Sequence, residues 1–321
     1  MSKFLLFALF LIATFFSLFM GSIDISIKDI LDTSSLKFEI LSQIRLPRTL
    51  LAFVSGGILA ISGLIFQTLF RNALMTPYTL GISSGAVLGA GIAIKLGLGT
   101  LVFGIAAITA FGFIGSLATL FLLLFLSKYI HSEQNVSLLL LGIALSLFYT
   151  AALTIIFYIS SFVETTTLLR FTMGSLSVVG WQSSILIGIS GVILLAILYF
   201  YRFELQLISI SDESARLKGV DTKKLTLILL VSSSLVVGML VSISGPIGFV
   251  GLVIPHIVAK VEQNSINKRI LSTFFSGGIF LILCDTLARS INTSAEIPIG
   301  VVTSLIGAPF FIWLIITRAR N

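Results

Sequence analysis

Long apolar runs alternate with short polar segments along almost the whole chain, which is the pattern of a helical membrane protein. A transmembrane helix needs about 20 predominantly apolar residues. The punctuation by charge, glycine, proline and asparagine predicts ten spans, near 4–20, 47–67, 79–97, 101–126, 136–159, 181–201, 225–243, 247–259, 270–288 and 298–316. The eighth is short and contains Pro255, so we expect it to be covered by protein rather than lipid. No A-x-A cleavage site follows the first run, which predicts an uncleaved span.

Composition narrows the class further. The chain is 57% hydrophobic and 10% charged, with a mean hydropathy of +1.14, whereas soluble domains carry about 25% charged residues. Most soluble enzyme classes are therefore excluded. Ten spans with short connections leave no room for a separate soluble domain, so residues 1–321 are expected to form a single transmembrane domain, all-α in class. Its longest polar segment on the side of the termini is 202–224.

The distribution of charge predicts the orientation. With ten spans both termini lie on one side, and 13 of the 20 lysines and arginines fall on that side. The positive-inside rule then places both termini in the cytoplasm. The net charge of +7 is thus mainly a topology signal, and we expect no nucleic-acid partner.

Catalytic and cofactor motifs are missing from the sequence. There is no phosphate-binding G-x-x-x-x-G-K-[ST] loop, so the chain itself should not hydrolyse ATP. One cysteine, Cys284, and two distant histidines, His131 and His256, provide no metal-ligand spacing. Ser83 and Ser84 do not fit the G-x-S-G motif that an intramembrane serine protease needs. We predict no catalytic residue, no metal site and no cofactor.

Charged residues are scarce within the predicted spans. Ion-coupled carriers usually place acidic, histidine or arginine side chains inside the membrane as coupling sites. Their scarcity favours a transporter whose energy comes from another subunit. A stand-alone secondary transporter remains the alternative from another class.

Three segments, in order along the chain, carry a family resemblance. The first contains Arg45–Arg48, Gly56-Gly57, Arg71–Leu74 and Gly81–Ala86; the second is Gly245–His256; the third contains Asp285, Arg289, Glu296–Gly300 and Gly307–Phe310. Together they resemble the FecCD family of ABC importer permeases, which take up ferric siderophores, haem and cobalamin. The resemblance runs from Arg45 to the C-terminus.

This resemblance implies a function and a set of partners. It implies the type II ABC importer architecture, with ten helices per subunit, in the cytoplasmic (inner) membrane of a bacterium. The partners implied are a second permease subunit (homodimer, or heterodimer with a paralogue), two ABC ATPase subunits and an extracytoplasmic substrate-binding protein. The expected cargo is an iron–siderophore complex, moved by alternating access; cobalamin and haem are the alternatives.

Three arginines lie at the predicted outer face, against the positive-inside bias. Arg45 and Arg48 are spaced i, i+3 around Pro47, and Arg289 lies i, i+4 from Asp285, so each pair shares a helix face. From the residues alone they can be membrane-interface anchors and a local ion pair. The resemblance implies instead that Arg45, Arg48 and Arg289 meet carboxylates of the binding protein, which arginine binds in bidentate fashion.

The polar segment 202–224 is the expected site of contact with the ATPase. Ser211 is suited to cap a short helix that has Asp212 and Glu213 in its first turn, and Gly219 is suited to end it. The stretch from Ala215 through Arg216, Leu217 and Lys218 to Gly219 is similar to the family's Ala-x-x-Leu-Gly loop, which implies docking into a groove of the ATPase. Lys218 stands where leucine is usual, and Leu217 is the substitute anchor.

A gate is expected at the cytoplasmic turn after the second span. Arg71-Asn72-Ala73-Leu74 resembles the family's Asn-Pro-Leu turn, which implies that Asn72 and Leu74 narrow the inner end of the pathway. From the residues alone, Asn72 is also an ordinary turn residue. Further gate residues are implied near 132–137.

Overall fold

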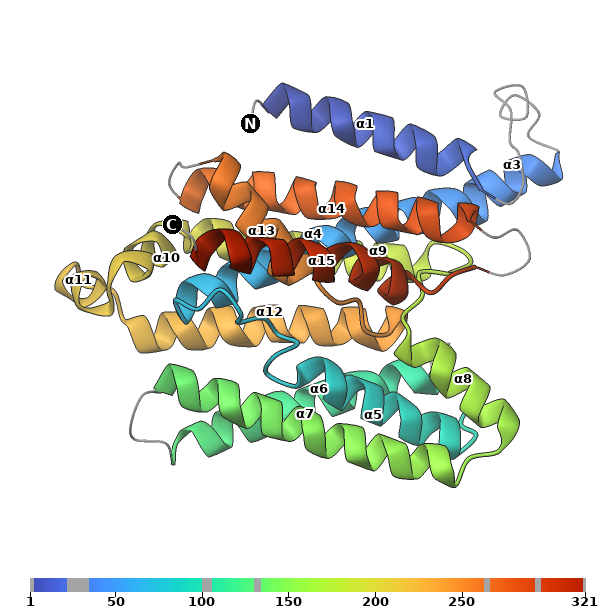
Figure 1. The fold of residues 1–321 in the computed structure, drawn as a ribbon, viewed down its shortest axis with the longest axis horizontal. Helices are drawn as coiled ribbons and strands as arrows, with labels where there is room; N and C mark the ends of the chain where they lie inside the picture. Colours follow the sequence, from blue (N-terminus) through green and yellow to red (C-terminus); the bar gives the residue numbers. More distant parts are fainter. Residues whose placement is uncertain are drawn as a thin grey trace. The chain divides into compact units, whose positions relative to one another are not determined.

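The structure is a computed structural model that describes residues 3–21, 35–99, 106–129, 134–262, 266–291 and 296–319. The chain is built of helices (Figure 1), as predicted. They are α1 (Lys3–Phe19), α3 (Leu36–Ile40), the π-helical turn η1 (Leu41–Arg45), α4 (Leu46–Leu69), α5 (Ile82–Lys95), α6 (Ala107–Ser127), α7 (Gln134–Tyr158), α8 (Phe162–Thr172), α9 (Gln182–Phe200), α10 (Arg202–Ile210), α11 (Asp212–Leu217), α12 (Thr222–Ser244), α13 (Val250–Val261), α14 (Ile266–Ser290) and α15 (Ile299–Ala319).

Each of the ten predicted spans coincides with an apolar helix. Six helical segments are long and apolar enough to cross a membrane, and four shorter apolar ones correspond to α1, α5, α13 and α15. The predicted short eighth span is α13, which has only 12 residues and contains the buried Pro255. The sequence pattern therefore located these ten apolar helices correctly, and six of them are long enough to be candidate spans. It did not predict α8, a separate helix that opens with a capping box between Ser161 and Glu164.

The described chain divides into two compact units. Unit 1 comprises Met1–Ile61, Ser175–Leu195 and Ile247–Asn321, and unit 2 comprises Ser62–Gly174 and Ala196–Pro246. Each unit has its own core.

Unit 1 is organised around the contact between α4 and α14. A Cβ at Gly56 would collide with the backbone of Gly277, and a Cβ at Gly277 would collide with the carbonyl oxygen of Gly56. Small residues let helices in membranes approach this closely. Beside them, Phe53 packs edge-on against Phe274, with ring centroids 5.5 Å apart. The start of α4 and the end of α14 also meet, where Arg48 pairs with Asp285.

Unit 2 is organised around α5 and α6, with α12 packed against both (Figure 1). Gly85 and Gly89 allow the contact with α6, because a Cβ at either would collide with α6. These two glycines therefore serve helix packing. Asp221 caps the start of α12 by accepting a hydrogen bond from the backbone of Lys224.

Candidate functional site

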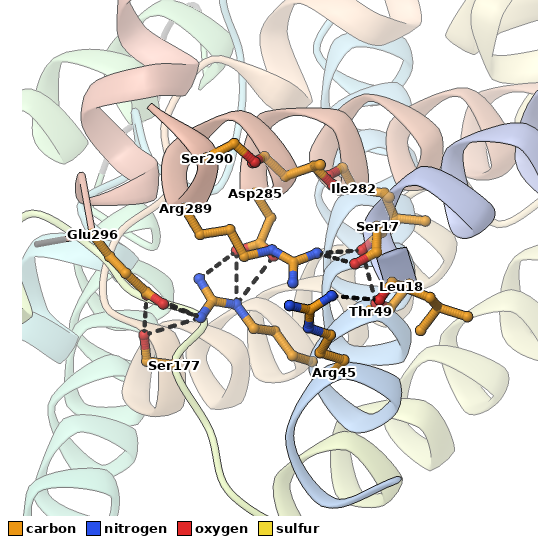
Figure 2. A network of polar contacts seen from close by, with 12 residues as sticks. Ser17, Leu18, Arg45, Thr49, Ser177, Ile282, Asp285, Arg289, Ser290 and Glu296 are labelled. Atoms are coloured by element: carbon orange, nitrogen blue, oxygen red, sulfur yellow. Dashed lines mark hydrogen bonds and ion pairs between the residues drawn. The ribbon is translucent and has the colours of Figure 1, made fainter. Parts of the chain in front are cut away.

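A buried arginine–carboxylate network lies in unit 1. Arg48, on the first turn of α4, donates from Nε and Nη2 to Asp285 Oδ1 of α14, at 3.0 and 2.9 Å, and Nε also reaches Oδ2 at 3.1 Å. Figure 2 labels Asp285 and Glu296, and its dashed lines mark the contacts of the network around them. The Arg48 and Asp285 side chains are 7% and 1% exposed. A carboxylate held by two donors of one guanidinium is a strong, geometrically specific pairing.

The remaining donor of Arg48 holds a second carboxylate. Nη1 donates to both oxygens of Glu296, at 2.9 Å each, and the hydroxyl of Ser177 donates to Glu296 Oε2 at 2.9 Å. Burial raises the pKa of Glu296, but the charge of Arg48 and the hydrogen bonds from Ser177 and Arg48 outweigh it and hold the pKa below its usual 4.5. Glu296 is therefore ionised at neutral pH.

The other two predicted arginines belong to the same region. Arg289 donates from Nη2 to the carbonyl oxygen of Ser17 and, at 2.7 Å, to the Ser17 hydroxyl, and its Nε lies 3.4 Å from Asp285 Oδ2. Arg45 donates to the carbonyl of Leu18 at 2.6 Å. Figure 2 shows these donors directed at the end of α1. The local ion pair that the i, i+4 spacing of Asp285 and Arg289 predicted is confirmed.

The sequence pattern paired Arg289 with Asp285 but did not predict the partners of Arg45 and Arg48. Arg45, Arg48 and Arg289 are only 4%, 6% and 5% exposed, so their guanidinium groups are engaged within the chain. Glu296 is the accessible charged member of the network, with a side chain 45% exposed. Its pairing with Arg48 spans 248 positions, and no local motif signals such a contact.

The polar segment 202–224 folds as two short helices followed by a cap. The Ser211 hydroxyl accepts from the backbone of Ser214 at 2.9 Å, which confirms the predicted N-cap of α11. Asp212 and Glu213 occupy the first turn, and Gly219 ends the helix with φ +81°. Its backbone NH donates to Arg216 at 2.9 Å. A glycine in this left-handed conformation is the common helix terminator.

The exposed side of α11 includes an apolar side chain. Ala215 is fully buried, whereas Leu217 is 84% exposed, and Glu213 and Arg216 are also exposed. An isolated leucine on a charged surface is common. Leu217, however, lies on a helix whose opposite side is packed through the buried Ala215. It therefore projects from an anchored helix and has charged neighbours.

An unpredicted ion pair links α11 to the turn after α4. Arg71 donates to Asp212 Oδ1 at 2.6 Å and to the carbonyl oxygen of Ile208 at 3.2 Å. Arg71 has a left-handed backbone, with φ +48°, which is uncommon for a residue other than glycine. The turn that contains Asn72 and Leu74 is thus connected directly to the predicted coupling segment.

Two hydrogen bonds to Asn72 shape the predicted gate turn. The side-chain oxygen of Asn72 accepts from the backbone of Leu74 at 2.9 Å, and the carbonyl of Asn72 accepts from Met75 at 3.1 Å. Asn72 therefore makes the turn expected of its type. Leu74 is 45% exposed. Residues 132 and 133 of the second predicted gate region, 132–137, lie outside the described residues.

Among the residues that the structure describes, no three His, Cys, Asp or Glu side chains lie close enough together to hold a metal ion. The polar groups present are arginines, carboxylates and hydroxyls that pair with one another. Such an arrangement can fix helices, dock charged partners and transmit movement.

Six of the described helical segments are long and apolar enough to cross a membrane, which is the composition of an integral membrane protein. The model of the FecCD transport family matches residues 9–317, so the chain belongs to that family and is an ABC importer permease. It is 38% identical over 312 residues to the hemin transport system permease protein HmuU of Yersinia pestis, covering 94% of this chain and 91% of that protein. It is 37% identical to the vitamin B12 import system permease protein BtuC of Salmonella schwarzengrund, over 87% of this chain and 84% of that protein.

A solved structure supports the same assignment. An inward-facing conformation of a metal-chelate type ABC transporter matches with a TM-score of 0.87 and 31% identity, covering 98% of both chains. The sequence-based identification of the family and of its helical permease architecture is therefore confirmed.

Proposed function

We propose that the protein moves an iron–siderophore complex across the cytoplasmic membrane of a bacterium by alternating access, as one permease domain with both termini in the cytoplasm. The metal-chelate class of the matching structure supports this cargo. Haem and cobalamin are the competing cargoes, because HmuU and BtuC carry those names. The absence of a ligand cluster among the described residues fits a metal that crosses inside its chelate.

The observation that most supports an ATP-driven mechanism is the geometry of α11. Leu217 projects from a capped helix that Ala215 anchors and that Asp212 ties to Arg71. We infer that one ATPase subunit docks here on each permease of the pair, two in all, with Leu217 and Glu213 at the contact, Arg216 beside them and Gly219 closing the helix. Through Arg71, movement of α11 would reach Asn72 and Leu74 at the gate.

Docking of an extracytoplasmic binding protein is the proposed role of Arg45, Arg48 and Arg289. Their burial means that an incoming carboxylate has to replace an internal one. Glu296 is the member to be replaced, because it is half exposed and shares Arg48 with the deeper Asp285. Glu296→Gln removes the competing charge and should tighten binding of the cognate binding protein several-fold, measured with the permease in nanodiscs. Weaker or unchanged binding would contradict the exchange.

The cargo is tested by uptake into a strain lacking the gene, with labelled ferric siderophore, haem and cobalamin in parallel. Selective loss of siderophore uptake, restored by the wild-type gene, is the expected result. Loss of haem or cobalamin uptake instead would replace the cargo and keep the mechanism.

The energy source separates an ABC importer from a stand-alone secondary transporter. Uptake should stop when ATP is depleted and survive an uncoupler that collapses the proton gradient while ATP is maintained. Copurification of the permease with two ATPase subunits per permease pair would support the assembly, and its subunit composition would decide between a homodimer and a heterodimer. Uptake that follows the proton gradient would contradict the proposal.

A further inference from the structure

A cavity of about 360 Å³ opens in unit 2 at the end where α11 lies. Its wall is assembled from the last turns of α4 and α6, the first turns of α7 and α12, and one side of α11. Figure 1 shows α12 beginning beside α11. These are the ends of candidate membrane spans, so the cavity lies at the depth where a bilayer meets water.

Three cations surround this cavity without acidic partners. Lys128, Arg216 and Lys223 line it, and none of them forms an ion pair with any of the described residues. The single acidic group in the lining, Asp212, is already paired with Arg71 at 2.6 Å. The cavity therefore has an excess of positive charge and attracts an anion.

Arg216 is held in position within the cavity. Its Nε donates to the hydroxyl of Thr222 at 3.2 Å, and Thr222 is buried at the start of α12. This leaves the terminal nitrogens of the guanidinium for a ligand. A planar guanidinium fork flanked by lysines is a common arrangement for recognising a phosphate group.

Most of the remaining lining residues are apolar, and they favour one source of phosphate. Leu124, Leu138 and Leu227 contribute to the wall, and Leu227 on α12 is 49% exposed. A free phosphate ion gains no binding free energy from contact with apolar side chains. A phospholipid would place its headgroup among the cations and lay an acyl chain along the leucines, covering apolar surface that is otherwise exposed.

We propose that this cavity binds the phosphate headgroup of an anionic phospholipid from the cytoplasmic leaflet. Basic pockets between membrane helices on the cytoplasmic side bind such headgroups. Since Asp212 and Arg216 belong to α11, the bound lipid would also steady the helix that contacts the ATPase in the proposed mechanism. The binding itself does not depend on which cargo is transported or on the docking of any partner.

The test uses purified, delipidated permease and two lipids of equal chain length. Phosphatidylglycerol, phosphatidylcholine and inorganic phosphate are added separately, and bound lipid and thermal stability are measured by native mass spectrometry and by melting in detergent. Phosphatidylglycerol should bind and raise the melting temperature, whereas the zwitterionic lipid and inorganic phosphate should do neither. Equal effects of the two lipids, or of inorganic phosphate, would overturn the proposal.

Variants locate the site. Lys128→Gln combined with Lys223→Gln should weaken phosphatidylglycerol binding by about 10–30-fold, since each basic residue near a membrane contributes about a factor of five. Lys268→Gln is the matched control, because Lys268 is exposed on α14 and does not line the cavity; it should bind as the wild type does. Lys128→Arg with Lys223→Arg should retain binding.

A second outcome distinguishes lipid from protein. If the cavity receives an acidic side chain of an ATPase subunit, the double glutamine variant will lose that subunit on copurification but bind phosphatidylglycerol like the control. That result would overturn the lipid proposal while leaving the proposed transport function intact.

Discussion

Arg48 of α4 and Asp285 of α14 lie 237 positions apart in the sequence and form a buried bidentate ion pair, with the shortest nitrogen–oxygen distances at 2.9 to 3.1 Å. Asp285 is fully buried, and Arg289 flanks it on its other side at 3.4 Å. A buried charge that loses its partner is expensive, because it has neither water nor a counter-ion. The start of α4 and the end of α14 are therefore held together by a contact that does not tolerate the loss of one charge alone.

Asp285→Asn is the sharpest test of this contact. The amide keeps the size of the carboxylate and removes its charge, which leaves Arg48 and Arg289 without their buried counter-ion. We expect a destabilisation of about 3–5 kcal/mol, seen as a large drop in the melting temperature of the permease in detergent. Replacing Arg48, Asp285 and Arg289 together by Met, Leu and Met leaves no buried charge at this contact and should cost much less. Equal losses in the single and triple variants would contradict the ion-pair account.

Glu296 predicts a pH dependence with a defined sign. Although burial raises its pKa, Arg48 and Ser177 lower it below 4.5 overall, so the folded protein binds this proton less readily than the unfolded chain. The ionised carboxylate thus stabilises the fold above about pH 4.5, and this contribution disappears as the pH falls through the lowered pKa. Wild type should melt above Glu296→Gln at pH 7, and the difference should shrink towards pH 3. A difference that is constant over this range would contradict the assignment.

Local patterns in the sequence predicted much of this molecule. Apolar runs located ten apolar helices because a membrane helix must be apolar over its own length. Ser211 and Gly219 marked the ends of α11 because caps depend on residues within one turn. The spacing of Asp285 and Arg289 likewise indicated their ion pair.

Contacts between distant segments could not be predicted in this way. Arg48, Glu296 and Ser177 meet because α4, the segment before α9 and the segment before α15 converge in unit 1. Their identities contain no sign of the pairing. The same holds for Arg71 and Asp212, which are 141 positions apart. The sequence predicted that the three arginines meet a partner protein, because it shows which residues are charged but not which charged side chains are covered by the rest of the chain.

The glycine contact between α4 and α14 predicts strong sensitivity to a single methyl group. Gly277→Ala places a Cβ against the carbonyl oxygen of Gly56, so the two helices must separate or bend. We expect a loss of about 1–3 kcal/mol, as for other overpacked sites. Gly188→Ala on α9 is the control, because nothing lies within 4 Å of a Cβ there. Its melting temperature should equal or exceed that of the wild type, and a similar loss in both variants would indicate a general effect of alanine.

Gly219 provides a test of the coupling helix that avoids any steric change. No atom lies within 4 Å of a Cβ at this position, while φ is +81°, so a substitution acts only through backbone strain. Gly219→Ala should cost the cap about 1–2 kcal/mol, whereas asparagine tolerates the left-handed conformation and should cost less. If α11 must be intact to hold the ATPase, copurification of the ATPase subunits should fall in the order glycine, asparagine, alanine, with the permease itself still folded. Equal recovery of ATPase with all three residues would show that the end of α11 is not part of the contact.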